Sequence, residues 1–231
     1  MICDACKSQH APHRKAPHGP PDLDTKPPKY FGDQATMDHI IYSQGDQSVK
    51  KDRVALVLYD RATHWLDSIP SVANDTIFTK QCLIEFYVGD SKPKKIYSDN
   101  APELVKACTE LEYPHDTNTP HRPQSNGVCE RCVRKVKEGT KCVLLQSGLH
   151  PLWWCWAMRC SCFLYNIVEK CFPQVSGPRL TPYQARFQSE FSGPIFPFGC
   201  SVEYQPSNPD YKDAGHAMGP KTRRGLFSAT I

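Results

Sequence analysis

Pro123-Gln124-Ser125-Asn126-Gly127-Val128-Cys129-Glu130-Arg131 is the stretch on which the expected fold depends. Its Pro, Ser, Asn and Gly residues are typical of a polar turn, and the residues after Asn126 have helical spacing. Glu130 is therefore predicted to lie in the first turn of a helix. A carboxylate held in that way can be directed at a metal ion.

Two further acids lie at strand positions upstream. Met37-Asp38-His39-Ile40-Ile41 is predicted to start a strand, and Ile96-Tyr97-Ser98-Asp99-Asn100 is predicted to end one. Asp and Glu are suitable ligands for Mg²⁺, because this ion prefers hard oxygen donors and keeps several waters. Taken singly, each acid also fits an ordinary role as a helix cap, a helix-dipole partner or a strand-edge charge. Together, on three ordered elements, they predict a metal site.

The composition excludes some classes of protein. The 231 residues can hold one full core with appendages, and 28 Lys+Arg against 24 Asp+Glu give a net charge of +4, which alone does not indicate a polyanion partner. Several of the twelve cysteines fall on apolar helix faces, so reduced, buried thiols are expected rather than a disulfide scaffold. Arg159 and Asn166 interrupt the apolar run 152–168, which favours a buried helix over a membrane span.

The order of the expected elements predicts the fold class. Three antiparallel strands come first, and helices then alternate with a strand, which indicates an α/β fold with helices packed on a mixed sheet. The expected strands are 38–42, 54–59, 63–69 and 95–98. The expected helices run from Asn74 or Asp75 to about Val88, from a cap at Asn100, from Asn126 to Ser147, and through Trp153, Trp154 and Trp156.

The helix after Asn126 is predicted to have a buried and an exposed face. Helical spacing places one acid and three cations on the exposed face: Glu130, Arg134, Lys137 and Lys141. The cations fit an ordinary solvated surface, but their nearness to Glu130 favours phosphate contacts, because DNA must pass close to the metal ions. His121 and Arg122 fit a solvated loop or a phosphate contact equally well.

Two other groups of residues have competing interpretations. Asp60 competes with Asp38 for the role of first acid, but it lies in a hairpin turn and is interpreted as a turn former. Cys3 and Cys6 have a zinc-type spacing, although tetrahedral zinc needs four ligands. His10, His13 or His18 could complete the site, and half of a site whose other ligands lie outside this chain is the favoured interpretation.

Residues 31–190 resemble the integrase catalytic core of copia-type long-terminal-repeat retrotransposons, which belong to the retroviral integrase superfamily. Asp38 in 32–39 matches the first acid of that family, Asp99 in Ser98-Asp99-Asn100 matches the second, and Glu130 in Pro-Gln-Ser-Asn-Gly-Val-Cys-Glu matches the third. The resemblance implies a ribonuclease-H-like mixed five-stranded sheet with flanking helices. It also implies two bound Mg²⁺ or Mn²⁺ ions.

The same resemblance implies partners and further site residues. Arg134 and Lys137 occupy positions where the family carries DNA-contacting basic residues, and Asn126 matches a polar residue of the flexible active-site loop. The expected partner is DNA, both the element's ends and the target. A homo-oligomer through the core is expected, with the Trp153-Trp154-Trp156 helix as a subunit contact, and no membrane partner is expected.

The flanking segments extend the resemblance to the whole chain. Residues 1–11 look like the residual C-terminal half of a His-His-Cys-Cys zinc module, with Cys3 and Cys6 as candidate ligands, and 12–30 form a proline-rich linker. Residues 191–231, which contain Phe198-Gly199-Cys200 and 219–227, look like the start of a truncated C-terminal β module. No secretory signal opens the chain, so a nuclear or cytoplasmic-particle location is expected.

The leading functional prediction is metal-dependent processing of DNA 3′ ends followed by strand transfer into target DNA. The first alternative is an inactive nucleic-acid-binding or assembly remnant that keeps the fold and the Arg134, Lys137 and Lys141 face. The second alternative is a ribonuclease-H-type nuclease, which needs a further acid, and Glu103 is the candidate for it.

Overall fold

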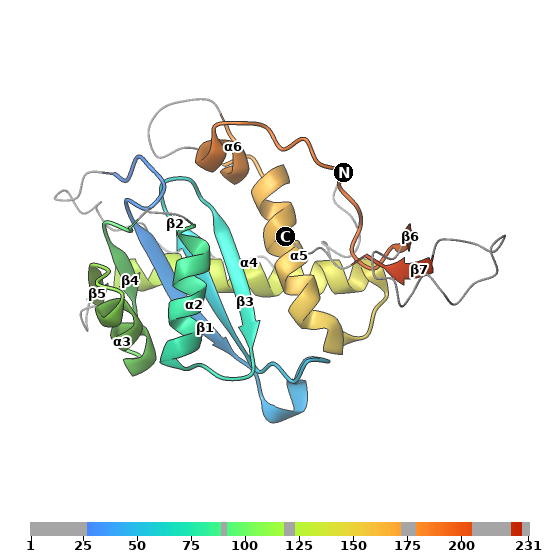
Figure 1. Ribbon diagram of the computed structural model, residues 1–231, viewed down its shortest axis with the longest axis horizontal. Coiled ribbons are helices and arrows are strands. Elements are labelled where there is room, and N and C mark those ends of the chain that lie inside the picture. Colours follow the sequence, from blue (N-terminus) through green and yellow to red (C-terminus); the bar gives the residue numbers. More distant parts are fainter. Residues whose placement is uncertain (1–26, 89–91, 118–122, 172–178, 205–222, 228–231) are drawn as a thin grey trace, which may run out of the picture.

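A mixed five-stranded sheet forms the centre of the molecule (Figure 1). The structure is a computed structural model that describes residues 27–88, 92–117, 123–171, 179–204 and 223–227. The strand order is β3-β2-β1-β4-β5, with β1, β2 and β3 antiparallel to one another and β4 and β5 parallel to β1. The strands are β1 Ala35–Ile41, β2 Val54–Asp60, β3 Leu66–Ser71, β4 Ile96–Ser98 and β5 His115–Thr117. The predicted ribonuclease-H-like sheet is confirmed.

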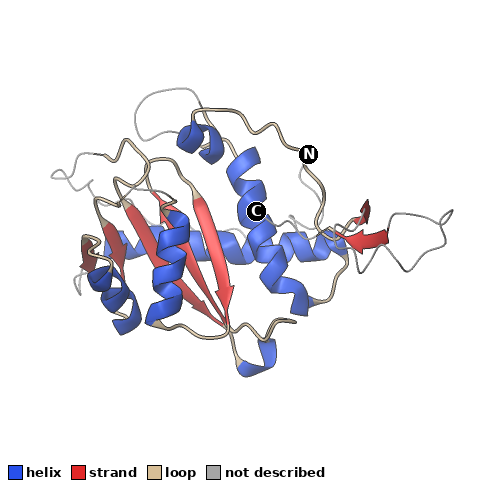
Figure 2. Cartoon of the chain, viewed as in Figure 1, coloured by secondary structure: helices blue, strands red, loops and turns tan. Residues whose placement is uncertain are grey.

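Helices cover both faces of this sheet (Figure 2). They are α2 Thr76–Phe86, α3 Pro102–Glu110, α4 Pro123–Ser147, α5 Trp154–Val168 and α6 Pro182–Phe187, with short 3₁₀ turns at Gln44–Asp46 and Pro151–Trp153. On one face, Met37 packs into a core with Leu83 of α2. On the other, Ile40 packs with Val136 of α4 and Met158 of α5. Side chains of β1 therefore alternate between two buried cores.

The start of α3 differs from the prediction by one residue. Asn100 was expected to cap this helix, but the N-cap is Ala101, and it makes no side-chain capping bond. Ala101 precedes Pro102, and a residue before proline is held in the extended region, so the helix can begin only after it. The turn is held instead by Asp99, whose Oδ1 accepts a hydrogen bond from the Ala101 amide at 3.1 Å.

The helix that carries Glu130 starts earlier than predicted. It was expected to begin at Asn126 after a polar turn, whereas α4 begins at Pro123. Proline is well tolerated at the first helical position, because the amide it lacks would have no partner inside the helix. Glu130 therefore lies about two turns into the helix and not in its first turn. The short strand β5, His115–Thr117, was also absent from the prediction.

The predictions for Asp60 and for the cysteine thiols agree with the structure. Asp60 is fully buried, and its carboxylate accepts hydrogen bonds from the amides of Gly32, Ala62 and Thr63, as a turn former should. Seven cysteines are buried thiols in the helix cores: Cys82, Cys108, Cys129, Cys132, Cys155, Cys160 and Cys162. Within the described ranges, no helix has the length and apolarity to cross a bilayer.

The C-terminal part of the chain packs on this core at two places. Arg186 of α6 donates to the Phe86 carbonyl at 2.8 Å, and its guanidinium stacks on Phe31 and Trp65 at 3.9 and 4.6 Å from the ring centroids. Burial lowers the pKa of Arg186 to about 10. Further on, β6 Ser201–Tyr204 and β7 Arg223–Leu226 form an antiparallel pair of strands.

The edge strand β3 is covered by an amide side chain. Asn166 of α5 accepts a hydrogen bond from the Leu66 amide at 3.0 Å and donates one to the Leu66 carbonyl at 2.8 Å. It thus replaces the neighbouring strand that an edge lacks. Asn166 is only 2% exposed, so water cannot easily take over these bonds.

We expect Asn166→Ala to lower the free energy of unfolding by about 3 kcal/mol, because two buried backbone groups lose their partners. Urea denaturation monitored by circular dichroism measures this change. The control is Gln146→Ala on the exposed side of α4, which should change stability by less than about 0.5 kcal/mol. Equal midpoints for the two variants would contradict the role given to Asn166.

Candidate metal and nucleic-acid site

Asp38 lies in the middle of β1, directly opposite Val57 of β2, on the sheet face that α4 covers. It is half-buried, and its Oδ1 accepts a hydrogen bond from the His39 amide at 2.8 Å. Burial, together with the negative charges of Asp99 and Glu130, raises the pKa of this carboxyl to about 6, although the His39 amide and the charge of Lys137 act to lower it. A buried acid beside two other acids is costly to ionise without a cation.

Asp99 follows the last residue of β4. That strand runs parallel to β1 with Ala35 opposite Ile96 and Thr36 opposite Tyr97, so Asp99 and Asp38 each lie two residues beyond the last pair, and the charge of Asp99 acts on Asp38. The backbone at Asp99 is held by Ser98, whose hydroxyl donates to the Asp99 carbonyl at 2.7 Å. The exposed Asp99 carboxylate is therefore placed by a strand end that is itself buried.

Glu130 reaches the same region from α4. It is exposed, whereas the preceding Cys129 is 6% exposed and is packed toward Thr36 and Asp38 of β1. Burial raises the pKa of the Cys129 thiol, and the Asp38 charge adds to that shift. The contact of Cys129 with β1 thus fixes where the turn of α4 that carries Glu130 lies.

The three acids gather at one region of the sheet but do not form a closed metal cage. Their charges act on one another, as the pKa of Asp38 shows. Within the described ranges, no three His, Cys, Asp or Glu side chains converge closely enough to hold a metal ion. The structure therefore supplies the oxygen donors that Mg²⁺ or Mn²⁺ prefers, in an open arrangement. The ligand roles of Asp38, Asp99 and Glu130 stay a prediction.

The exposed face of α4 carries the predicted cations. Arg134, Lys137 and Lys141 are all exposed, and Lys137 is close enough to Asp38 for its charge to lower the pKa of that acid. The opposite face of the helix is buried through Cys132 and Val136. The prediction that this helix has one exposed and one buried face is confirmed, whereas DNA binding by the cations stays a prediction.

Several predicted site residues cannot be placed. Cys3, Cys6, His121 and Arg122 lie outside the described residues, and so does the side chain of Asn126. The zinc and phosphate-contact predictions for them therefore stay predictions.

Glu103 makes its polar contacts on the sheet face opposite Asp38. Its Oε1 accepts a hydrogen bond from Asn74 Nδ2 at 2.9 Å and lies 3.5 Å from His39 Nδ1. His39 and Asp38 are consecutive residues of β1, so their side chains lie on opposite faces of the sheet. The fourth acid that a ribonuclease-H-type nuclease needs is not provided by Glu103. The contact of Glu103 with His39 was not predicted from the sequence. The one local sign of it was that Glu103 follows Asp99 by one helical turn.

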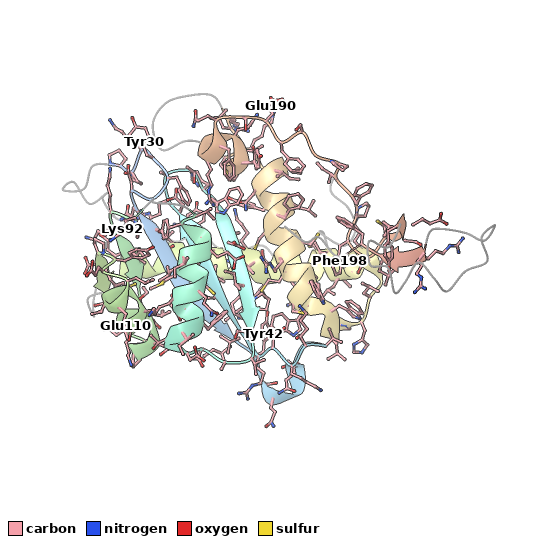
Figure 3. All side chains as sticks on the ribbon, in the orientation of Figure 1. Tyr30, Tyr42, Lys92, Glu110, Glu190 and Phe198 are labelled. Atoms are coloured by element: carbon pink, nitrogen blue, oxygen red, sulfur yellow. The ribbon has the colours of Figure 1, made fainter. Side chains whose placement is uncertain are left out.

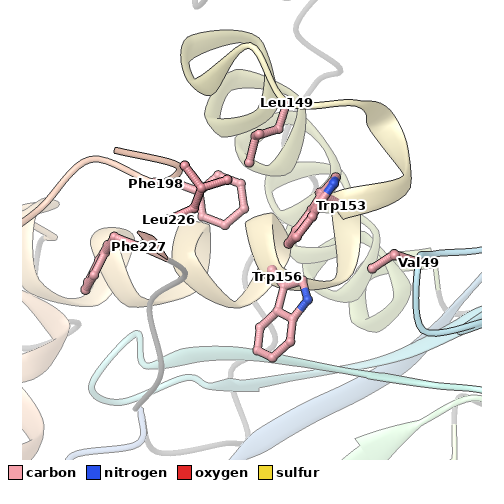
Figure 4. A pocket seen from close by; sticks show the side chains of 7 residues that line it. All are labelled: Val49, Leu149, Trp153, Trp156, Phe198, Leu226 and Phe227. Atoms are coloured by element: carbon pink, nitrogen blue, oxygen red, sulfur yellow. The ribbon is translucent and has the colours of Figure 1, made fainter. Parts of the chain in front are cut away.

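The described residues also form an apolar pocket of about 360 Å³ (Figure 4). Seven apolar side chains line it: Val49, Leu149, Trp153, Trp156, Phe198, Leu226 and Phe227. None of these residues is an acid, and the pocket lies beyond the C-terminal end of α4, whereas Glu130 lies near the other end. The pocket is therefore separate from the acids and unsuited to binding a divalent ion.

The Trp-rich segment of this region is only partly available to a partner. Trp154 is 7% exposed, belongs to the core between α4, α5 and the sheet, and donates from Nε1 to the Asp46 carbonyl at 2.9 Å. Trp153 and Trp156 are half-buried at the pocket. Trp154 therefore packs inside its own subunit, and a subunit contact through this helix stays a prediction.

The raised pKa of Asp38 predicts a pH-dependent stability. Its ordinary value is 3.8 and its value in the folded chain is about 6, so the folded state binds this proton more tightly than the unfolded state. The free energy of unfolding therefore falls as the pH rises from about 4 to about 6, and stays lower above that range.

We expect Asp38→Asn to raise the free energy of unfolding by about 1 kcal/mol at pH 8 without divalent ions, a figure reduced for the partial exposure of the side chain. At pH 4 the difference should nearly vanish. Urea denaturation at the two pH values measures it. Asp116→Asn, which removes a 3.0 Å ion pair with Lys95, is the control and should not stabilise at pH 8. A stability gain of the same size at both pH values would show that the raised pKa of Asp38 is not its cause.

Comparison with known proteins identifies relatives among retroelement polyproteins. The chain is 26% identical to the Gag-Pol polyprotein of baboon endogenous virus (strain M7) over 153 residues, which are 64% of this chain and 8% of that protein. It is 31% identical over 96 residues to the Pol polyprotein from transposon TNT 1-94 of Nicotiana tabacum, covering 39% and 7% of the two chains. With transposon RE2 of Arabidopsis thaliana the identity is 25% over 173 residues, covering 70% and 11%. The chain thus spans only a small part of each relative.

No protein-family model matches the chain. Among solved structures, the integrase catalytic core domain of HTLV-2 in complex with magnesium (trimeric form) has a TM-score of 0.52 at 19% identity, covering 68% of this chain and 97% of that one. A chain of the simian T-cell lymphotropic virus intasome in complex with PP2A regulatory subunit B56 gamma has a TM-score of 0.55 at 18% identity, covering 97% and 76%. The chain is therefore a relative of retroviral and retrotransposon Pol polyproteins, with the ribonuclease-H-like fold of integrase catalytic cores.

Proposed function

We propose that this chain is a retroelement integrase core that cuts and joins DNA with two Mg²⁺ or Mn²⁺ ions held by Asp38, Asp99 and Glu130. The observation that carries the proposal is that β1, the end of β4 and α4 bring Asp38, Asp99 and Glu130 to one region of the sheet, where the charges of the other two acids help to raise the pKa of Asp38. A cation bound near the three acids would stabilise their ionised forms. The fold shared with a core domain solved in complex with magnesium supports the same choice of metal.

The divalent ions and the residues of the chain would contribute different parts of the chemistry. When bound, divalent ions lower the pKa of water and neutralise charge on the phosphorus. Asp38 would contribute a half-buried carboxylate on the central strand, Asp99 one at the end of the parallel strand, and Glu130 one from the helix above. Because the first two project from a paired sheet, they would orient the site, and α4 would close it.

The proposed reaction has two phosphoryl-transfer steps. First, a water oxygen attacks a phosphodiester near the element's DNA end, forming one P–O bond and breaking the bond to the 3′-oxygen, which leaves as a hydroxyl. The freed 3′-hydroxyl then attacks a phosphodiester of the target in the same way. The chain's residues form no covalent intermediate, so their task is to bind and orient.

The exposed face of α4 is proposed to hold the DNA backbone. Arg134, Lys137 and Lys141 lie one, two and three turns beyond Glu130 on one side of the helix. Phosphates bound along these cations would bring a scissile bond to Glu130 and Asp38. Lys137 is the central cation, because its charge already reaches Asp38.

An inactive remnant remains the second candidate. The open arrangement of the acids favours it, because no three ligand side chains within the described ranges surround a common point. Such a remnant would keep the fold and the cationic face of α4. It would bind DNA without a requirement for a divalent ion.

Glu130→Gln tests the choice between the two candidates. We expect the substitution to weaken Mn²⁺ binding to the chain, measured by electron paramagnetic resonance of free Mn²⁺, by at least about 10-fold, and to abolish Mg²⁺-dependent strand transfer in a fusion that restores an upstream zinc module. Glu138→Gln, two turns further along α4, should change neither. Binding of Mn²⁺ that is equal in wild type and Glu130→Gln would remove Glu130 from the site.

The cationic face predicts a salt dependence of DNA binding. For a 20-base-pair duplex, we expect each of Arg134→Gln, Lys137→Gln and Lys141→Gln to make the negative slope of log K against log salt concentration shallower by about 0.9, because each removes one phosphate contact. Fluorescence anisotropy at several salt concentrations measures the slope. Lys106→Gln on α3 is the control with an exposed cation, and an equal effect of that variant would show that net charge alone is responsible.

A further inference from the structure

We propose that Glu103 is a positioning residue that holds Asp38 and Asp99 in their relative places. This inference rests on the proposed function. Glu103 lies in the first turn of α3, and that helix begins directly after the Asp99 turn. Its Oε1 accepts a hydrogen bond from Asn74 Nδ2 at 2.9 Å and lies 3.5 Å from Nδ1 of His39, the neighbour of Asp38.

The need for such a link follows from the short pairing between the two strands. β1 extends to Ile41, but its ladder with β4 comprises only Ala35 opposite Ile96 and Thr36 opposite Tyr97. Asp38 and Asp99 both come after the last residue pair of this ladder, so no further pairing of β1 with β4 joins the two segments that carry them. The contact between Glu103 and His39 lies beyond the last rung and bridges the same two segments.

The surroundings of His39 support its link to Glu103. The His39 side chain is 6% exposed, and its Nε2 is buried without a hydrogen-bond partner in the described residues. Of the two ring nitrogens, Nδ1 is thus the one that lies near a charged side chain, the Glu103 carboxylate. The His39 amide, in turn, donates to Asp38 Oδ1 at 2.8 Å. A shift of His39 is thus passed directly to the carboxylate of Asp38.

Helix α3 packs against α2 through Leu104, Ala107 and Cys108, but its N-terminal end lacks a side-chain cap. Ala101, its N-cap, makes no side-chain capping bond, and the first turn is held by the Asp99 carboxylate and by Glu103. Asn74 belongs to the connection that precedes α2, so the Glu103 carboxylate joins three segments: β1, the start of α2 and the start of α3. Groups hydrogen-bonded to metal ligands typically change metal affinity about 10–100-fold when they are removed, and Glu103 would act one step further out, through His39.

The experiment compares four forms of the full chain: wild type, Glu103→Ala, Glu103→Gln and Asn74→Ala. Gln keeps the oxygen that accepts from Asn74, whereas the two Ala variants lose that bond. Glu110→Gln is the matched control, because Glu110 lies on the same helix and is exposed (Figure 3), and it pairs with Lys80 at 2.9 Å. Asn74 is exposed, so its variant tests the bond even if Glu103→Ala does not fold.

The first readout is Mn²⁺ binding without DNA. We expect Glu103→Ala to raise the dissociation constant about 10-fold, Asn74→Ala to raise it less, and Glu103→Gln and Glu110→Gln to stay within about twofold of wild type. If Glu103 were itself a metal ligand, Glu103→Gln would weaken Mn²⁺ binding, so retained Mn²⁺ binding in this variant distinguishes a positioning residue from a ligand. If Glu103→Gln lost binding as fully as Glu103→Ala, or if both Ala variants bound like wild type, the positioning role would be overturned.

The second readout is hydrogen exchange without metal, which separates this inference from the proposed function. Glu103→Ala and Asn74→Ala should speed exchange at the His39 amide and in the first turn of α3, while Glu110→Gln should not. If no form binds Mn²⁺ but exchange changes in this way, the metal function fails and the link between the acid segments stands. Unchanged exchange in both Ala variants would overturn the link whatever the metal result.

Discussion

The alternation of side chains along the central strand β1 is the constraint on which the rest of the structure depends. β1 is paired on both edges and covered on both faces, so each residue must suit the side to which it points. Met37 and His39 face α2 and α3, whereas Asp38 and Ile40 face α4. A slip of one residue would exchange these sets and bury Asp38 away from α4, which makes the register of β1 a condition for any metal site.

Elements with a clear local signal could be predicted from the sequence. β2 is a continuous apolar run, and α2 begins after Asp75, which caps it by accepting from the Phe78 amide at 2.8 Å. β5 gave no such signal, because His115-Asp116-Thr117 is polar and lies at the sheet edge, where one neighbouring strand suffices. The start of α4 was missed because Pro123 suits both a turn and the first position of a helix.

The sequence could predict which elements carry the three acids but not the contacts around them, and the role of the acids as metal ligands stays a prediction. Asp38, Asp99 and Glu130 stand out because they match a spaced motif on ordered elements. What surrounds them depends on contacts between segments far apart in the chain, such as that of Glu103 with His39, which no local pattern encodes. The open arrangement of the acids is likewise a property of packing.

Helix α4 connects two separate cores of the molecule. Its C-terminal half packs through Val143 into a core with Phe198 of the C-terminal segment, while Glu130 lies near the other end. At 1.5 Å per residue, Glu130 and Ser147 are about 26 Å apart along the helix. Between these points Cys132 and Val136 pack against the sheet, so the acid is held by the sheet and the far end of the helix by the C-terminal segment. A substitution at Phe198 would therefore loosen the end of α4 that lies away from the acids.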